Sequence, residues 1–186
     1  MTDVAHQKNE TDKNVHDLGM GTGENQFLTF VLEQEEYAVD ILRVQEIRGW
    51  ERVTRIPNTP AYIRGVLNLR GSIVPIVDLR MRFNMKSVEY GVTTVIVVLK
   101  VYKDDGAGSR TMGIVVDGVS EVYSVPQSEI RDAPDFGTKV RTEFIKGLAT
   151  IDDKMVIIID IDKMLNSDEL AVVDSVTESI GKSKDK

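Results

Sequence analysis

The chain has 186 residues, of which 41% are hydrophobic and 28% charged, a composition typical of a globular protein with an apolar core. It contains no cysteine, which excludes disulfides, thiolate metal sites and a cysteine nucleophile. The formal net charge of −7 disfavours nucleic acid as a partner. The only two histidines, His6 and His16, lie in a polar N-terminal segment, so the region expected to fold offers no imidazole base.

Short β-rich runs separated by polar or glycine turns are expected to follow a disordered tail over residues 1–25. Residues 44–47 predict a short helical turn closed by Gly49. Apolar spacing towards the C-terminus predicts an amphipathic helix over 167–180, followed by a disordered tail over 181–186. The expected strands cover residues 27–32, 37–42, 51–56, 62–69, 72–78, 92–102, 111–117, 119–125, 145–151 and 155–161. This succession predicts an all-β fold, either barrels or a sandwich.

Part of the chain is repeated. Residues 64–79 align without gaps with residues 146–161, sharing a base, a glycine, an apolar run, a turn and a closing Asp-aliphatic pair. Upstream, residues 44–47 are similar in sequence to residues 119–122. Two copies in the same order favour two similar β-subdomains that share a core and leave a groove between them. The alternative is that unrelated β-hairpins merely share a composition.

The densest acidic cluster consists of Asp152, Asp153, Asp160 and Asp162. Carboxylates at this spacing suit a divalent cation or an acid–base pair. However, the first two fall at a hairpin turn and no calcium-binding loop follows, which favours a solvated turn. Neither GxGxxG nor GxxxxGK[ST] occurs, so no nucleotide or other cofactor is expected.

Glu46 and Arg70 stand beside apolar residues near expected strand ends, and each belongs to a repeated segment. They predict either an ordinary surface ion pair or a polar pair on the rim of an apolar contact patch. Trp50 and Tyr62 are expected to be core or edge-covering aromatics.

Several motifs carry a resemblance to a known family. They are ILRVQEIRG (41–49), VTRIPNTP (53–60), GVLNLRGSIVPIVDL (65–79), GIVVDGVSEV (113–122) and TEFIKGL (142–148). Together they resemble the CheW family of bacterial chemotaxis coupling proteins from about Gln26 to Val176. The resemblance implies a domain over 26–166 made of two five-stranded SH3-like β-barrels, the first at about 36–90 and the second at about 92–160, with the first strand possibly shared.

The resemblance also implies a scaffold that is not an enzyme and needs no cofactor or metal. Its partners would be the cytoplasmic tips of methyl-accepting chemoreceptors and the regulatory domain of the histidine kinase CheA. Such a protein would be cytoplasmic and recruited to receptor arrays at the inner face of the membrane, with no inserted segment and no nucleic acid.

Family binding positions fall on two groups of residues in this sequence. Val44, Glu46, Gly65 and Arg70 would lie on or near binding surfaces of the first barrel, and Thr94, Val95, Val119 and Val122 in a receptor-facing groove. The substitutions Arg70→Glu and Val95→Asp should then weaken receptor recruitment and leave the fold intact.

Two alternatives belong to other classes. One is a ligand- or metal-dependent enzyme that uses the carboxylates between Asp152 and Asp162. The other is an oligonucleotide-binding barrel, which would need a basic, aromatic-lined face; an aromatic content of 6% disfavours it.

Overall fold

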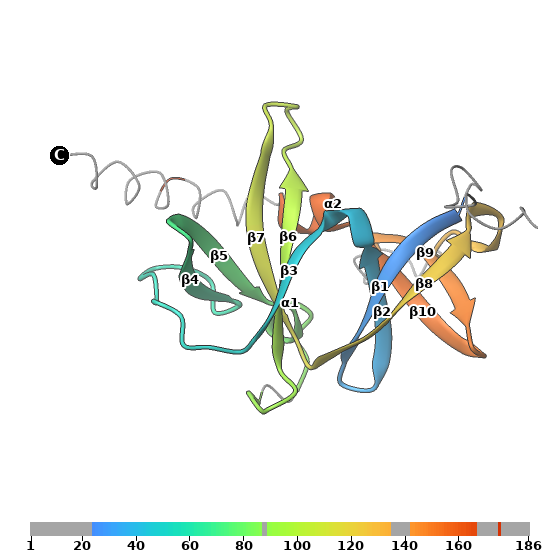
Figure 1. Cartoon of the computed structure of the whole chain (residues 1–186), viewed down its shortest axis with the longest axis horizontal. Helices are drawn as coiled ribbons and strands as arrows, with labels where there is room; N and C mark the ends of the chain where they lie inside the picture. Colours follow the sequence, from blue (N-terminus) through green and yellow to red (C-terminus); the bar gives the residue numbers. More distant parts are fainter. Residues whose placement is uncertain (1–23, 87–88, 135–141, 167–174, 176–186) are drawn as a thin grey trace, which may run out of the picture.

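The computed structural model of the chain describes residues 24–86, 89–134, 142–166 and 175. Its described part is almost entirely β, with two five-stranded sheets side by side (Figure 1). The first sheet has the strand order β8 (Gly118–Pro126), β1 (Glu24–Leu32), β2 (Glu35–Asp40), β10 (Lys154–Ile159) and β9 (Ile145–Ile151). The second has the order β3 (Val44–Gly49), β6 (Val95–Tyr102), β7 (Ser109–Val116), β5 (Ser72–Asp78) and β4 (Ile63–Leu69).

The second sheet is continuous in sequence and interrupts the first. We call residues 44–116 the inserted module, and residues 24–40 with 118–166 the split module. The ranges predicted for the two barrels, 36–90 and 92–160, therefore do not match the sheets. Strands β6 and β7 complete the sheet begun by β3, and β2 pairs with β1 and β10.

Both sheets curl, but neither ladder closes into a continuous barrel within the described residues. In the inserted module one antiparallel bridge, Thr54 to Val66, spans from the segment after β3 to β4. In the split module the bridge Arg131 to Leu148 spans from the segment after β8 to β9. Each sheet also contains one parallel pair, β5 with β7 and β2 with β10.

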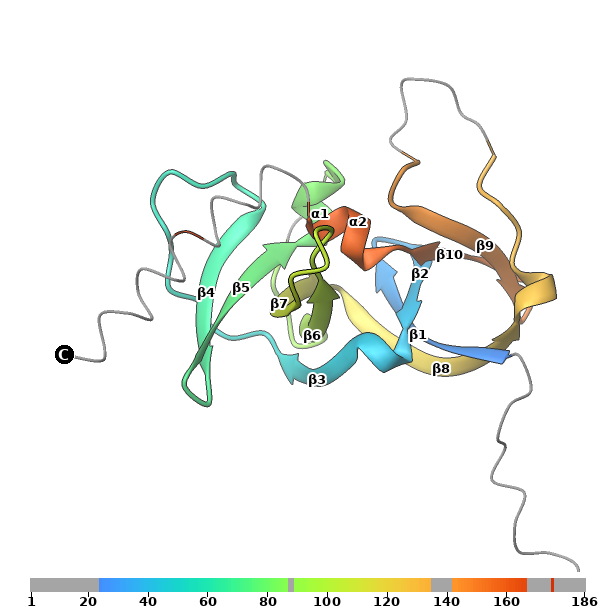
Figure 2. The ribbon, with the colours of Figure 1, turned by 90° about the horizontal axis from the view of Figure 1, so that it is seen from above.

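The predicted repeat is confirmed as structural duplication. The hairpin β4–β5 leads into α1 (Leu79–Arg82), just as β9–β10 leads into α2 (Ile161–Leu165), and Figure 2 shows both helices near the junction of the modules. Asp78 and Asp160 occupy matching positions, and each side chain accepts a hydrogen bond from the backbone of the helix that follows. Their own backbone N–H groups donate to Tyr62 and Phe144, which also match.

Alternation along the strands sorts apolar side chains into three clusters. On β6, Val97 and Leu99 face the largest cluster, which draws from both sheets and which we call the central cluster, while Ile96 and Val98 face the interior of the inserted module. Phe27 on β1 faces the interior of the split module. The predicted shared core is therefore present, and the central strands are buried on both faces.

Local expectations differ from the structure in several places. Residues 44–47 belong to strand β3, and the helical turn precedes them as the 3-10 helix η1 (Ile41–Arg43). Residues 51–56 form no strand beyond the single bridge at Thr54. Strand β1 begins at Glu24, inside the predicted tail. The rest of that tail, the residues 181–186 and nearly all of the helix predicted over 167–180 lie outside the described residues.

Candidate partner-binding surface

Glu46 and Arg70 do pair. Arg70 Nη2 lies 2.7 Å from Glu46 Oε2, and Arg48 Nη1 lies 2.9 Å from the other carboxylate oxygen. The two guanidiniums hold the pKa of Glu46 below its ordinary value, chiefly through the hydrogen bond from Arg48. Because β3 and β4 are the two edges of their sheet, this pair ties the open edges together. The Arg70 side chain remains 82% exposed, so it is available to a partner.

The second predicted group lies where the chain crosses from β7 to β8. Val95 pairs with Val116 in the ladder, and Val119 follows at the start of β8. Both Val95 and Val119 are half-buried against the central cluster, as is Val44. Val95→Asp would place a carboxylate against that core, so we now expect this substitution to destabilise the fold as well.

Only one of the apolar residues predicted for the groove is well exposed. Val122 is 47% exposed on β8, whereas Thr94 is 3% exposed. The Thr94 hydroxyl accepts a hydrogen bond from the Gly91 backbone, and its carbonyl accepts one from Trp50. Val122 is thus the member of this group that offers apolar contact area.

Gly65 is buried and serves packing. Its φ is +142°, and a Cβ atom at this position would lie 2.1 Å from the Thr54 carbonyl oxygen. The Thr54–Val66 bridge requires that close approach. Gly147, its counterpart in the split module, is crowded in the same way but less tightly, since a Cβ atom there would lie 2.9 Å from the Arg131 carbonyl oxygen. Gly65 can therefore affect a binding surface only by positioning residues 54 and 55.

The aromatic residues lie as predicted, at the edge of apolar clusters. Trp50 packs against the interior cluster of the inserted module and stacks on Tyr90 with ring centroids 4.1 Å apart. Tyr62 packs against the central cluster.

The acidic cluster is engaged in folding. Asp152 and Asp153 form the β9–β10 turn with positive φ values of 48° and 62°, and Tyr123 donates a hydrogen bond to Asp152. Asp160 caps α2, and Asp162 binds Arg43 at 2.7 Å. Among the described residues no group of three or more His, Cys, Asp or Glu is arranged to hold a metal ion. Turn, cap and ion-pair roles thus account for the clustering of these four aspartates.

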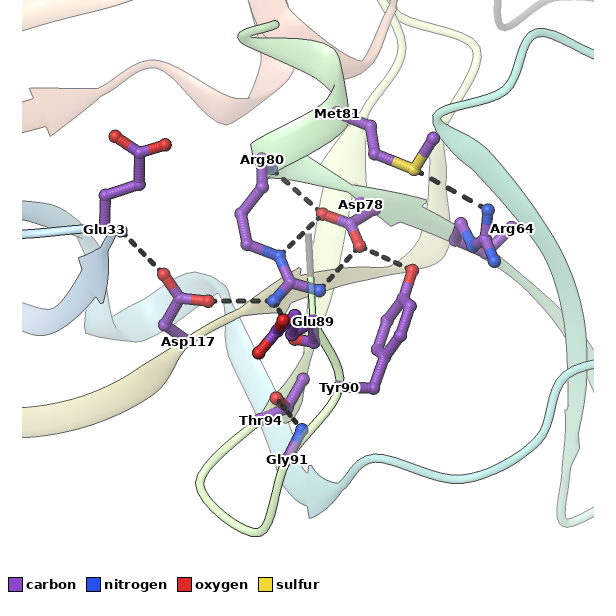
Figure 3. A network of polar contacts seen from close by, with 10 residues as sticks. All are labelled: Glu33, Arg64, Asp78, Arg80, Met81, Glu89, Tyr90, Gly91, Thr94 and Asp117. Carbon is purple, nitrogen blue, oxygen red and sulfur yellow. Dashed lines mark hydrogen bonds and ion pairs between the residues drawn. The ribbon is translucent and has the colours of Figure 1, made fainter. Parts of the chain in front are cut away.

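A buried ionic network, shown in Figure 3, is not indicated by any sequence motif. Arg80 is 1% exposed and holds the carboxylate of Asp78, which is fully buried, at 2.8 and 3.1 Å. It also holds Asp117 at 2.8 Å, and Asp117 accepts a hydrogen bond from the Glu33 backbone in the β1–β2 turn. Arg80 thus links the two modules.

Burial alone would lower the pKa of Arg80, but the hydrogen bonds and charges of Asp78 and Asp117 raise it above its ordinary value. Tyr90 donates a 2.7 Å hydrogen bond to Asp78, and burial together with this bond raises the pKa of Tyr90 to about 12. In this network the Arg80 guanidinium therefore stays charged and the Tyr90 phenol stays protonated.

A pocket of about 730 Å³ lies beside Trp50, and no sequence motif indicates it either. Its lining includes three arginines, which come from the segment after β3 and from the start of β4. The lining residues are Trp50, Arg52, Val53, Thr54, Arg55 and Arg64. None of the eight predicted partner-binding residues lines it, although Gly65 packs against its wall.

These features define the class of protein to which the chain belongs. Two SH3-like β-modules, related to each other by duplication, share one apolar core and carry charged pairs at their edges. Such an arrangement is typical of a protein that presents surfaces to other proteins. No helix among the described residues is long and apolar enough to span a membrane.

Comparison with known proteins supports this class. The family model for the CheW-like domain matches residues 26–169. The chemotaxis protein CheW of Klebsiella aerogenes is 51% identical over 154 residues, covering 83% of this chain and 89% of that protein, and CheW of Rhizobium meliloti is 36% identical over 147 residues, covering 79% and 91%. The crystal structure of the scaffolding protein TtCheW from Thermoanaerobacter tengcongensis has a TM-score of 0.69 at 32% identity, covering 78% of this chain and 95% of that one. The chain belongs to the CheW family of chemotaxis scaffold proteins.

Proposed function

We propose that this chain is a non-catalytic adaptor that couples the cytoplasmic tips of chemoreceptors to the histidine kinase CheA. Membership of a chemotaxis scaffold family supports a place in signalling complexes. The observation that carries the proposal is the exposed Arg70, held by Glu46 across the sheet edges. Receptor state would control the kinase through contacts that differ between the active and inactive arrangements.

The proposed contact surface includes both predicted groups. Glu46 and Arg70 supply polar contacts at the edge of the inserted module, and Val122 supplies apolar area on the split module. Val44, Val95 and Val119 support these surfaces from the central cluster, and Gly65 and Thr94 shape the backbone beneath them. Such an arrangement suits recognition with specificity set by charge.

Reconstitution tests the proposal directly. Kinase autophosphorylation is measured with receptor-containing membranes and CheA, with and without this chain. The chain should raise autophosphorylation and make it respond to receptor ligand. Unchanged kinase activity with the folded chain present would refute the coupling role.

Two substitutions test the surface. Arg70→Glu reverses an exposed charge and Val122→Asp places a charge on exposed apolar area, so each should weaken co-sedimentation with receptor membranes by about tenfold or more. Val92→Asp is the matched control, because Val92 is fully exposed and belongs to neither group. Equal binding by all three variants and the parent would contradict the surface assignment.

A further inference from the structure

The pocket beside Trp50 gathers positive charge that the rest of the described structure leaves uncompensated. Arg52 and Arg55 are exposed and have no ion-pair partner among the described residues. Glu51, the neighbouring carboxylate, is already held by Arg48 at 2.6 Å. The chain as a whole has a formal net charge of −7, so this local group of cations is opposite in sign to the overall charge.

Arg64 completes the wall. Its guanidinium lies over the Tyr90 ring at 5.4 Å, and its Nη1 lies 3.6 Å from the Met81 sulfur, a weak acceptor. Its Nε is a buried donor with no acceptor among the described residues. This nitrogen is buried, so a ligand in the pocket would have to bind the other guanidinium nitrogens of Arg64.

We propose that Arg52, Arg55 and Arg64 bind carboxylate side chains of an acidic segment of a partner protein, with an apolar side chain of that segment resting on Trp50. This site goes beyond the adaptor surface proposed above. Arg64 lies at the start of β4 and Arg70 in the turn that follows it, so the length of the strand, about 20 Å, separates them.

The lining favours a peptide segment over a small ligand. None of the six lining residues is buried, and Arg52, Thr54 and Arg55 are exposed, so the pocket does not enclose its occupant as small-molecule sites do. Arginine and tryptophan are the residues enriched at the centres of protein interfaces. A planar guanidinium also matches a carboxylate by two parallel hydrogen bonds.

Gly65 keeps the site open. The β4 backbone at Gly65 supports the carbonyl of Thr54, next to Arg55, and any side chain at position 65 would displace that segment. The bridge from Thr54 to Val66 fixes the same backbone from the other side. The pocket is thus built where the irregular segment around Thr54 is bridged to β4.

Trp50 is the only tryptophan in the chain, so its fluorescence reports on this site alone. The test titrates the full chain with an acetylated hexapeptide of alternating glutamate and leucine, and with the same peptide carrying glutamine for glutamate. We expect a saturable change in Trp50 emission with the glutamate peptide, at least tenfold weaker binding of the glutamine peptide, and weaker binding as salt rises.

Variants locate the site. Arg52→Gln with Arg55→Gln should weaken peptide binding by about tenfold or more, and Arg52→Lys with Arg55→Lys should weaken it less, because charge remains without the bidentate geometry. The matched control is Arg131→Gln with Lys146→Gln, which removes the same charge from the equivalent edge of the split module and should change binding less than twofold. Circular dichroism confirms that each variant is folded.

Three results would overturn the proposal. One is the absence of a saturable Trp50 signal with the glutamate peptide. Another is equal weakening by the two glutamine double variants, which would show non-specific charge attraction. The third is displacement of the peptide by equimolar inorganic phosphate, which would identify a phosphate site. None of these readouts involves the kinase or receptors, so failure here leaves the coupling test unaffected.

Discussion

At the scale of single residues, Arg80 shows how this chain uses a buried charge. A lone guanidinium at 1% exposure would be strongly disfavoured, but Asp78 and Asp117 neutralise it and the Glu89 carbonyl accepts a further hydrogen bond. Sequence patterns did not predict this role, because a charged residue after a strand is normally read as surface. Only the packing of α1 against the crossover from β7 to β8 buries it.

Replacing Arg80 by methionine should lower the free energy of unfolding by about 3–5 kcal/mol, because Asp78 is left as a buried carboxylate without its partner. The double variant Arg80→Met with Asp78→Asn should recover part of that loss. Urea unfolding followed by circular dichroism measures both. Arg131→Gln, an exposed control, should stay within about 0.5 kcal/mol of the parent. An Arg80→Met variant as stable as that control would show that the network contributes little.

Tyr90 gives a prediction for alkaline pH. Burial and the hydrogen bond to Asp78 raise its pKa from the ordinary 10.0 to about 12, so the folded state binds this proton more tightly than the unfolded state. The resulting stabilisation is complete below pH 10 and is lost as the pH rises towards 12. Unfolding midpoints measured across this interval should therefore fall more steeply in the parent than in Tyr90→Phe.

Phenolate absorbance provides the second readout. The pKa of Tyr123 is also raised to about 12, through its hydrogen bond to Asp152 first and burial second. Tyr90→Phe and Tyr123→Phe should each remove one late-titrating phenol from the parent curve. A Tyr90→Phe curve that loses a phenol titrating near pH 10 would contradict the assignment.

At the scale of elements, the sequence predicts the hairpins well and their partners poorly. The repeat of residues 64–79 in 146–161 identifies two hairpins and the aspartates that follow them, because local turn chemistry and alternation determine both. The division of the strands between the two sheets depends on contacts between residues far apart in the chain. No local pattern in residues 35–40 indicates a parallel pair with β10.

The same limit applies to the candidate site. Glu46 and Arg70 could be singled out because both lie in repeated motifs. The pocket could not, because Arg52 and Arg55 lie in a segment without regular structure and meet Arg64 only through the bridge from Thr54 to Val66. Family resemblance marked Gly65 as interfacial, whereas the structure shows it to be a packing residue.

Two glycines of the β4–β5 hairpin make it possible to distinguish the free-energy cost of backbone strain from that of steric crowding. Gly65→Ala meets both a positive φ and the Thr54 carbonyl, whereas Gly71→Ala meets only a positive φ of 89° with no heavy atom near its Cβ. We expect Gly71→Ala to cost about 1–2 kcal/mol and Gly65→Ala about 3 kcal/mol or more. Urea midpoints compare them. Equal losses of stability would mean that the segment around Thr54 moves away from position 65 without cost.

At the scale of the whole molecule, the two modules are bound together by topology as well as by contact. The chain leaves the split module after β2, completes the inserted module and returns through Asp117 into β8. The central cluster fills the junction with side chains from both sheets, including Leu28 and Leu99. Neither module can lose its structure without exposing the core of the other.

This arrangement predicts one cooperative unfolding transition that a single core substitution shifts as a whole. Leu99 on β6 is fully buried in the central cluster, so Leu99→Ala should cost about 2–5 kcal/mol. Trp50 fluorescence reports on the inserted module and far-UV circular dichroism on the strands of both modules, and both urea midpoints should fall together. Val98→Ala, facing the interior of the inserted module, is the comparison variant and should also move both probes, because the shared core couples them. A Trp50 transition at lower urea than the circular dichroism transition would show instead that the inserted module unfolds alone, and that the junction is an interface between independent domains.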